Sequence, residues 1–428
     1  MSTQSYRWYV VGLMTLTYAF NLADRVLISV MLEPIKAEFS LSDTLMGFFG
    51  GGLYAYTYAL FSIPLGWLCD RVNRRNLLAA CLAAWSLMTV LSGFTRSIFQ
   101  LGMAQSMVAV AESGSPPAMN SLISDLFARK ERGLPLSVWF MGVSMGYFLG
   151  YALGGHLADA YGWRMAFVIL GVPGIVLAVL IRLTMRETAR GAADGGANIA
   201  APTLSATFAF FRSQVSLRHA IYATCLLGLG FMGPNYWMTA FFVRSHEVSL
   251  SEAGAVIGVV MGVSGIIGAP LGGLLVDRLS RRDVRWPPRL ASGLLATSVL
   301  PMSLLYLSES TTVAYAACFV LAMLTTMVPI FLLTLISNLA AAQFRGLSVS
   351  IMLLLMMAFG YGLGSQLVGL ASDLFSNVFD LGNDSLRYAS LSMGVFALWG
   401  AVHFWVIGRH ARAGYAEAVR LEQSSATA

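Results

Sequence analysis

Long apolar stretches alternate with short polar and charged segments along the whole chain. Because a hydrocarbon core about 30 Å thick needs about 20 apolar residues per helix, these stretches are long enough to cross a membrane. The alternation predicts an all-α membrane protein with twelve transmembrane helices. The predicted spans are residues 8–32, 44–68, 77–95, 98–127, 135–158, 163–183, 217–243, 252–276, 289–308, 311–339, 345–372 and 386–408.

One sequence pattern occurs twice, after the second and after the eighth predicted span. The stretches GWLCDRVNRR (Gly66–Arg75) and GLLVDRLSRR (Gly273–Arg282) both fit G-x-L-x-D-R-x-x-R-R and lie about 207 residues apart. Before the same spans, SLSD (Ser40–Asp43) and SLSE (Ser249–Glu252) both resemble a helix-start capping box. The repeat predicts two bundles of six helices joined by an Ala/Gly-rich loop. The predicted boundaries are 1–183 for the N-terminal bundle, 184–216 for the linker loop, and 217–428 for the C-terminal bundle with its short tail.

Charge is scarce and is concentrated in the loops. Charged residues make up 11% of the chain and hydrophobic residues 57%, as expected of a protein that lies mostly in a membrane. The net charge of +6 comes from basic residues in the loops of one side, which indicates orientation and not nucleic-acid binding. Basic loops face the cytoplasm, so both termini and the linker loop are predicted to be cytoplasmic. The expected location is a bacterial inner (cell) membrane.

Three ionisable side chains stand near the middle of predicted spans: Asp24 and Arg25 in the first, and Glu112 in the fourth. Each charge at this depth costs at least about 2.5–3.5 kcal/mol on insertion scales, and such charges usually mark ion or substrate paths. We expect them to pair around a watered cavity, where they bind substrate and couple it to protons. Arg25 is expected to reach either Glu112 or Asp24. The alternative is an ion pair with a purely structural role.

The doubled loop motif and the layout of six plus six spans resemble the major facilitator superfamily over the whole chain. The resemblance implies two pseudo-symmetric six-helix bundles and transport by alternating access. The family's glycine between the two basic pairs is replaced by Asn73 and Ser280. In addition, GVSMGYFLGYALGG (Gly142–Gly155) resembles the family's glycine-rich gating helix, and its small residues at every fourth position predict close packing on a neighbouring helix.

The loop motif is expected to form a conformational latch on the basic side. Its carboxylates at helix ends can face the positive N-terminus of a neighbouring helix, and its arginines can bridge to Asp125 or Glu131. For the arginines, a role as topological anchors is an equal alternative; the charge of the aspartates works against anchoring and favours the latch. The expected latch residues are Gly66, Asp70, Arg71, Arg74, Arg75, Asp277 and Arg278.

Two further stretches narrow the resemblance. NLADRVLISVMLEPI (Asn21–Ile35) is similar to the first span of the Spinster transporters and, somewhat less, to that of the anion:cation symporters for sugar acids. AESGSPPAMNSLISDLFARKERG (Ala111–Gly133) resembles the Spinster family more closely. The Spinster resemblance implies lysophospholipid or sphingoid-type substrates, whereas the alternative family implies small sugar acids. Many facilitators carry an arginine where this chain has Gln105, so the positive charge has to come from Arg25.

The second half offers no charge that matches those of the first half. Its seventh span, LGLGFMGPNYWMTAFF (Leu227–Phe242), contains a Gly-Pro break, and broken spans point to transporter binding sites. A packing kink is the alternative, equally favoured for Trp237. The expected cavity is charged on one wall and apolar on the other, with a wall that suits an acyl chain better than a polyol. Its candidate lining residues are Asn21, Asn235, Tyr236, Phe231 and Phe319.

Other classes of protein find little support in the sequence. No Gly-Lys pair occurs, so there is no phosphate-binding loop and no nucleotide-driven pump. Uphill transport must then use a gradient, for which protons are the expected ion. No enzyme motif is present, and the four cysteines have spacings that suit neither a zinc site nor a disulfide framework. We expect no catalytic residue, metal or cofactor; the expected partners are a small-molecule or lipid substrate, protons and membrane lipids, for a monomer.

Overall fold

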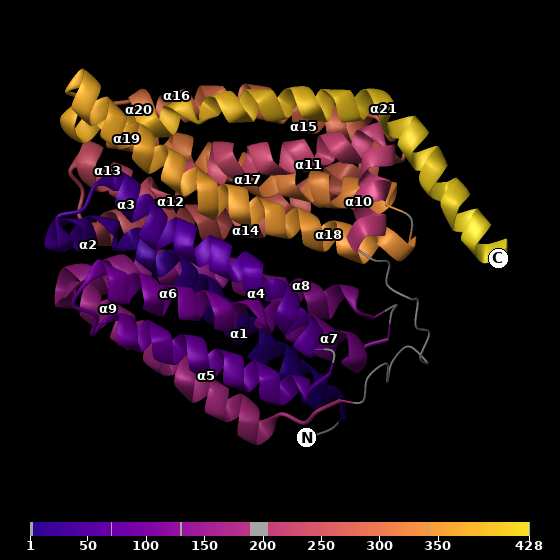
Figure 1. Cartoon of the computed structure of the whole chain (residues 1–428), viewed down its shortest axis with the longest axis horizontal. Helices are drawn as coiled ribbons and strands as arrows, with labels where there is room; N and C mark the ends of the chain where they lie inside the picture. The colour runs from indigo at the N-terminus through magenta and orange to yellow at the C-terminus, as the bar shows by residue number, and fades with distance from the viewer. Residues whose placement is uncertain (1–2, 70, 129–130, 189–203, 341, 428) are drawn as a thin grey trace. The chain divides into compact units, whose positions relative to one another are not determined.

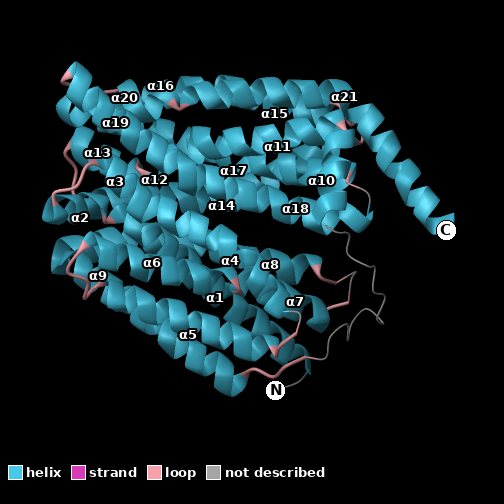
Figure 2. Cartoon of the chain, in the orientation of Figure 1, coloured by secondary structure: helices cyan, strands magenta, loops and turns pink. Residues whose placement is uncertain are grey.

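The computed structural model describes residues 3–69, 71–128, 131–188, 204–340 and 342–427. Helices account for most of them, and these ranges contain no strand (Figure 2). Nine stretches within them are long and apolar enough to cross a membrane. One, Gly133–Thr184, turns at Gly162, where φ is 81° and ψ is 159°, and therefore forms two spans. Two more spans, Asp43–Cys69 and Ile98–Leu126, are built from shorter helices, which brings the described helices into agreement with the predicted twelve.

The chain folds into two compact units. The first comprises Met1–Ala197 and Tyr236–Val263, and the second comprises Asn198–Asn235 and Ser264–Ala428. The predicted bundles were defined by the sequence repeat, whereas these two units are defined by which residues contact one another. They differ because the segment 236–263, from the second repeat, packs with the first.

The first unit is a bundle of long helices (Figure 1). Its members are α1 (Thr3–Val30), α2 (Leu32–Phe39), α3 (Asp43–Met46), α4 (Leu53–Cys69), α5 (Arg74–Ser92), α6 (Ile98–Ser113), α7 (Ser115–Leu126), α8 (Gly133–Phe148), α9 (Gly154–Thr184) and α13 (Met238–His246), with single π-helical segments at Gly47–Gly52 and Leu149–Leu153.

The second unit is built in the same way. It contains α10 (Leu204–Ser213), α11 (Val215–Leu227), α15 (Trp286–Thr297), α16 (Val299–Leu307), α17 (Thr311–Leu339), α18 (Ala342–Met357), α19 (Ser365–Phe379), α20 (Ser385–Ser392) and α21 (Gly394–Thr427), with π-helical segments at Gly228–Met232 and Ala358–Gly364 and a 3₁₀ turn at Gly382–Asp384. Two helices contribute to both units: α12 (Gly233–Tyr236) and α14 (Leu250–Ser280).

Glycines set the contact between α1 and α8, as the sequence predicts. A Cβ atom added at Gly142 would lie 2.5 Å from the carbonyl oxygen of Thr15, and one at Gly146 would lie 2.5 Å from that of Ala19. No real side chain tolerates such distances, so the two backbones approach as closely as only glycine permits. This contact holds α1, and with it the charged residues of the first span, in a fixed place.

The helix start predicted at Ser249 is confirmed, whereas in the first copy the cap is Ser42 and the predicted Ser40 ends α2 with φ at 50°. The Ser42 hydroxyl accepts a hydrogen bond from the backbone N–H of Leu45 at 3.3 Å, and the Ser249 hydroxyl accepts one from Glu252 at 3.1 Å. Each satisfies a backbone donor that would otherwise lack an intrahelical partner. The carboxylate of Asp43 has a further role on the surface of the unit, which is described below.

Candidate functional site

Arg25 and Glu112 form the polar centre of the first unit. The guanidinium of Arg25, on α1, lies 3.3 Å from Oε2 of Glu112, on α6. The Glu112 side chain is fully buried, and that of Arg25 is 14% exposed. Of the two acids that the sequence offers to Arg25, the structure brings Glu112 to it. Removing one member of a buried pair costs about 3–5 kcal/mol, because the remaining charge is left without compensation.

Two tyrosines and an asparagine complete the surroundings of Arg25. Tyr54, on α4, accepts a hydrogen bond from Nε of Arg25 at 3.0 Å and donates one to Oε2 of Glu112. One turn before Arg25, Asn21 accepts a hydrogen bond from the guanidinium at 3.2 Å. The guanidinium carbon also lies 5.1 Å from the ring centre of Tyr58. Sequence analysis missed both tyrosines, although their spacing of four residues places them on one face of an apolar helix.

Asp24 has a different partner from its neighbour in the chain. Its Oδ2 accepts a hydrogen bond from the Thr89 hydroxyl, on α5, at 3.1 Å. Successive residues of a helix point about 100° apart, so Asp24 meets α5 while Arg25 meets α4 and α6. Asp24 is only 4% exposed, and no described cation pairs with it.

Three buried polar atoms around this centre have no hydrogen-bond partner among the described residues. They are Nδ2 of Asn21, Oδ1 of Asp24 and Oε1 of Glu112. Buried polar groups are nearly always hydrogen bonded, to protein or to ordered water. An open donor and two open acceptors beside a cation therefore form a site that water, a proton or an anionic group would complete.

The lining residues predicted from the second half belong to different units. Tyr236 is buried in the first unit, where its hydroxyl lies against Gly50 so closely that a Cβ atom there would overlap it. Phe231 and Asn235 belong to the second unit, and Phe231 is buried. Phe319, also in the second unit, is 37% exposed. The break in this span was predicted at the Gly-Pro pair, but Gly233 and Pro234 lie within α12 and the helix is interrupted at Trp237, between α12 and α13.

On the basic side, Arg74 makes the strongest contacts of the predicted latch. It forms an ion pair with Asp125 and a second one with Glu187 at 3.0 Å, and it donates to the Ser121 hydroxyl at 2.7 Å. Its side chain is 2% exposed. The backbone N–H of Arg75 donates to Glu187 at 2.8 Å. Asp125 was expected as a partner of these arginines, whereas Glu187 was missed because it follows the sixth span, far away in the sequence.

The other latch residues make weaker contacts. Arg71 stacks on Trp67, with its guanidinium carbon 3.8 Å from the ring centre. Asp277 and Arg278 are exposed and pair with no described residue. Gly66 faces open space, and Asp70 lies outside the described residues.

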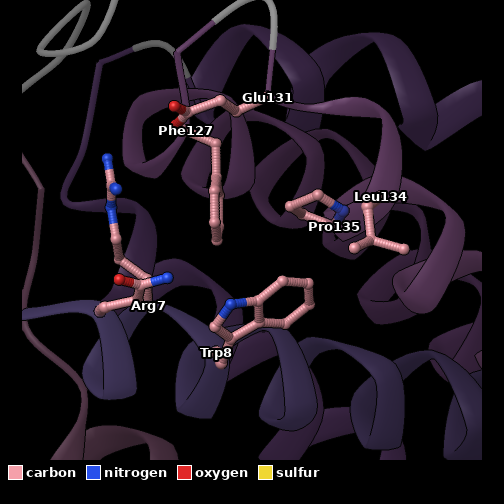
Figure 3. A pocket seen from close by; sticks show the side chains of 7 residues that line it. Arg7, Trp8, Phe127, Glu131, Leu134 and Pro135 are labelled. Atoms are coloured by element: carbon pink, nitrogen blue, oxygen red, sulfur yellow. The ribbon is translucent and has the colours of Figure 1, made fainter.

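Glu131, the second expected partner of the arginines, lies in a different place. It lines a small pocket with residues from α1 and α8 (Figure 3). There the ring of Phe127 lies 5.8 Å from that of Trp8 and 5.1 Å from the guanidinium carbon of Arg7. The pocket is lined by residues at the start of α1 and the start of α8, and therefore lies at the ends of these spans and not at their middle. None of the predicted binding residues lines it.

A second ion cluster joins the two repeats at the opposite end of the first unit. Arg244, in the last turn of α13, donates two hydrogen bonds to Asp43, at 2.6 and 2.7 Å, and one to Glu33 at 2.8 Å. Lys36 pairs with the same aspartate at 2.6 Å. Burial acts to raise the pKa of Asp43, but Arg244 and Lys36 outweigh it and lower that pKa from 3.8 to about 2. We call these four residues the Arg244 cluster.

Beside the Arg244 cluster, α14 is fastened to the end of α9's first segment. The Asp159 carboxylate accepts a hydrogen bond from the backbone N–H of Ser251 at 2.7 Å, at the first turn of α14. A carboxylate is favourable at the positive end of a helix. Gly254 and Gly258 then bring α14 against Tyr151 and Phe148, with only backbone atoms between them.

This fold and this site define a membrane transporter, and the comparisons with known proteins give its family. Residues 14–365 match the Major Facilitator Superfamily, so the chain belongs to that superfamily. An MFS-type efflux pump of Mycolicibacterium smegmatis is 29% identical, over 96% of this chain and 95% of its own. Protein spinster homolog 1 of Homo sapiens is 27% identical, over 68% of this chain and 58% of its own. A probable galactarate/D-glucarate transporter, GudP of Bacillus subtilis, is 24% identical over 69% and 71%.

A solved structure extends the likeness to the fold. It is that of a bacterial homologue of the human lysosomal transporter Spinster, in an inward-facing and unoccupied conformation. Its TM-score is 0.85 at 26% identity, and the match covers 96% of this chain and 98% of that one. The predicted facilitator fold and the resemblance to Spinster are therefore confirmed, and the protein is a transporter and not an enzyme.

Proposed function

We propose that this protein is a proton-coupled secondary transporter of an anionic, amphipathic solute of the lysophospholipid or sphingoid-phosphate type. The observation that carries the proposal is Arg25, a buried cation whose only acidic partner among the described residues is Glu112. A buried cation with one carboxylate partner can exchange that partner for an anionic substrate. Alternating access between the two sides of the membrane would then move the substrate.

Protonation of Glu112 provides the coupling. The ionised carboxylate holds Arg25 at 3.3 Å, and a neutral carboxyl group attracts a guanidinium far less. A proton arriving at Glu112 therefore releases Arg25 for a phosphate or carboxylate head. Asp24 is the second candidate for the proton, because it is buried and no described cation compensates its charge. In both cases substrate and proton share one cation.

The Arg244 cluster acts as the gate on the side opposite the basic loops. It ties Glu33 and Asp43, from the first repeat, to Arg244, from the second. Two ion pairs and the Asp159 contact with α14 would have to break for this side to open. In the proposed orientation, with the basic loops and both termini in the cytoplasm of a bacterium, the gate faces outward.

The side chains predicted to line the cavity favour a lipid-like substrate over a sugar acid. A sugar acid needs hydrogen bonds to its hydroxyl groups, since an unpaired buried hydroxyl costs about 1–3 kcal/mol. Among the residues predicted to line the cavity, Phe231 and Phe319 offer no hydrogen bond to a polyol, while Asn235 and Tyr236 are a polar minority. A proton-coupled symporter of sugar acids is the second candidate, supported by the likeness to GudP.

A ligand panel on the purified protein tests the substrate class. Lysophospholipids are expected to raise the melting temperature, and hexuronate or galactonate are not; saturation at 100 times Kd corresponds to about 2.7 kcal/mol. The double variant Arg25→Met/Glu112→Gln, which leaves no unpaired charge, should lose the effect. Arg96→Ala, at an exposed arginine, is the matched control. Stabilisation by a sugar acid alone, lost in the double variant, would keep the site and replace the lipid by the second candidate.

A further inference from the structure

Two arginines of the second unit, Arg289 at the start of α15 and Arg409 in α21, lie at the same tryptophan ring and have no acidic partner among the described residues. Both lie on the ring of Trp405, with guanidinium carbons 5.7 and 5.8 Å from its centre. Arg289 also lies 5.8 Å from the ring centre of Trp286. Its Nε is buried and has no hydrogen-bond partner in the described chain. We call these four residues the Trp405 cluster.

The acids nearest in sequence are already engaged by other arginines. Asp283 binds Arg285 at 2.9 Å and Arg412 at 2.7 Å, and their hydrogen bonds hold its pKa well below the usual value. The two helices that carry the Trp405 cluster also offer it no acid: α15 contains none, and α21 contains none before Arg412. Its two positive charges are therefore uncompensated by the described protein and suit an external anion.

The place of the cluster in the fold identifies the kind of anion. Arg289 begins the predicted span 289–308 and Arg409 directly follows the predicted span 386–408, so both lie at a membrane boundary. Trp286 and Trp405 are 49% and 45% exposed, and exposed tryptophans at this depth mark the headgroup level of a bilayer. A soluble anion would not need such indole rings.

An apolar surface leads from the membrane interior to the cluster. On α21 the exposed side chains Val395, Leu398 and Val402 recur at helical spacing, and Trp405 is the next in the series. The neighbouring helix α16 exposes Leu300 and Leu304. These stripes contact acyl chains in a membrane, and the stripe on α21 ends at the two arginines.

Helix packing fixes the cluster in place. The Ser292 hydroxyl donates to the carbonyl oxygen of Ala401 at 2.7 Å and joins α15 to α21. At Gly408, an added Cβ atom would lie 2.9 Å from Cγ of Arg289, so the stem of this arginine passes directly over the glycine. The two guanidinium groups are thereby held near one ring before any ligand binds.

We propose that the Trp405 cluster is a binding site for the phosphate headgroup of an anionic membrane phospholipid. The phosphate lies between the guanidinium groups of Arg289 and Arg409, and an acyl chain follows the exposed stripe of α21. Arginine suits this task because its planar fork binds phosphate oxygens in pairs. The site lies in a different unit from Arg25 and does not depend on the identity of the transported solute.

Lipid binding to the delipidated, full-length protein tests the proposal. Native mass spectrometry would follow titrations with phosphatidylglycerol and, separately, phosphatidylcholine. We expect phosphatidylglycerol to bind more tightly, and Arg289→Gln and Arg409→Gln each to weaken it about fivefold. Arg409→Lys should bind more tightly than Arg409→Gln but less tightly than the wild type, because the charge remains while the paired hydrogen bonds are lost. Arg281→Gln, at an exposed arginine of the preceding loop, is the matched control and should behave as the wild type.

Three results would overturn the proposal. Equal binding of the two lipids would show that the phosphate charge is not recognised, and an equal loss in Arg281→Gln would show a diffuse basic surface. Displacement of phosphatidylglycerol by glycerol phosphate at the same concentration would identify a soluble anion as the ligand. If Arg289→Gln fails to fold, as judged by circular dichroism and elution volume, the exposed Arg409 decides the test by itself.

Discussion

Glu112 gives one oxygen to both Arg25 and Tyr54, and its other oxygen has no partner among the described residues. A proton on Oε1 would therefore meet no cation, while the ion pair at Oε2 would lose much of its attraction. Tyr54 donates to Glu112 and accepts from Arg25, so it keeps the two groups in register whether or not they attract each other. Under the proposed coupling, a proton on Glu112 would weaken its hold on Arg25 while Tyr54 keeps both side chains in place.

Replacing Glu112 by glutamine is expected to separate coupling from transport. The amide cannot ionise, so a pH gradient should no longer drive accumulation, while exchange of substrate across the membrane continues. Proteoliposomes with an imposed pH gradient measure the first activity, and counterflow at equal pH measures the second. Glu38→Gln, at an acid near the end of α2, is the control. If Glu112→Gln still accumulates substrate along the pH gradient, the proton is carried elsewhere, with Asp24 as the next candidate.

At this scale the sequence predicted the members of the site better than their pairing. Asp24, Arg25 and Glu112 stand out because charges are rare in apolar spans. Which acid pairs with Arg25 depends on how each helix is rotated about its axis in the bundle. The sequence alone does not give these rotations. Tyr54 and Thr89 were missed because tyrosine and threonine are common in membrane helices and become notable only beside a charge.

Among the elements, α2, α3 and α13 stand out because they carry the Arg244 cluster, in which nearly all the charge is buried. The side chains of Arg244 and Asp43 are 8% and 3% exposed, so their pair is screened little by salt. By contrast, Arg164 and Glu38 on the same side of the unit are exposed, and both belong to the first repeat. Of these two groups of ion pairs, the Arg244 cluster is the one that joins the repeats.

Loss of the Arg244 cluster should therefore favour the state that is open on its side. In Arg244→Gln, a reporter cysteine at Asn21 is expected to react at least about tenfold faster with an impermeant maleimide from that side, because breaking a buried pair costs about 3–5 kcal/mol. The measurement uses a background without the four native cysteines. Arg164→Gln removes an exposed pair within one repeat and should leave the rate unchanged. Equal rates in wild type and Arg244→Gln would exclude the gate.

The pKa of Asp43 fixes the pH range of this gate. Since its pKa is lowered to about 2, the pair is fully formed above about pH 4 and is lost only as the pH falls toward 2. Between pH 5 and 8 the Arg244 cluster does not titrate at Asp43. The pH profile of substrate uptake by wild-type proteoliposomes should therefore contain no step from Asp43 over that interval, whereas in Arg244→Gln burial is opposed by Lys36 alone and the pKa of Asp43 should rise.

Elements were predicted well where glycine, serine and the apolar period define them, as at the Ser249 helix start. The contact of α14 with the first unit was not predicted, because it joins residues such as Asp159 and Ser251 that no local pattern relates. The Arg244 cluster was missed for the same reason. Apart from Asp43, which appeared as the acid of a predicted helix start, its residues belong to no sequence pattern.

For the whole molecule, the two halves differ in chemistry although they share one plan. The first unit contains the intramembrane charges and the buried ion pairs of Arg74, while Asp277 and Arg278 in the second copy of the loop motif are exposed. The repeat therefore predicted the fold of both halves, and it could not predict how they diverged in function. The two copies share the helix pattern but differ at individual positions, and these differences cannot be predicted from the repeat.

Cysteine labelling tests alternating access in the whole molecule. Single cysteines at Asn21 and Asn235, again without the native ones, are expected to react with a water-soluble maleimide from one side of the membrane at a time. Substrate or a pH change should alter which side reacts. A cysteine at the exposed Phe94, at the end of span three, serves as a control for constant labelling from one side. If neither Asn21 nor Asn235 is labelled from either side, the cavity assignment fails.

The distance in sequence between Arg25 and Glu112 also affects how the protein is made. Arg25 is synthesised 87 residues before its partner, so the first helix leaves the ribosome with an aspartate and an arginine that nothing yet neutralises. At about 2.5–3.5 kcal/mol for each charge, insertion of this helix alone is expensive. We therefore expect the first helix to integrate stably only after the fourth helix has been synthesised. Until Glu112 is available, the insertion machinery has to keep the first span out of the lipid.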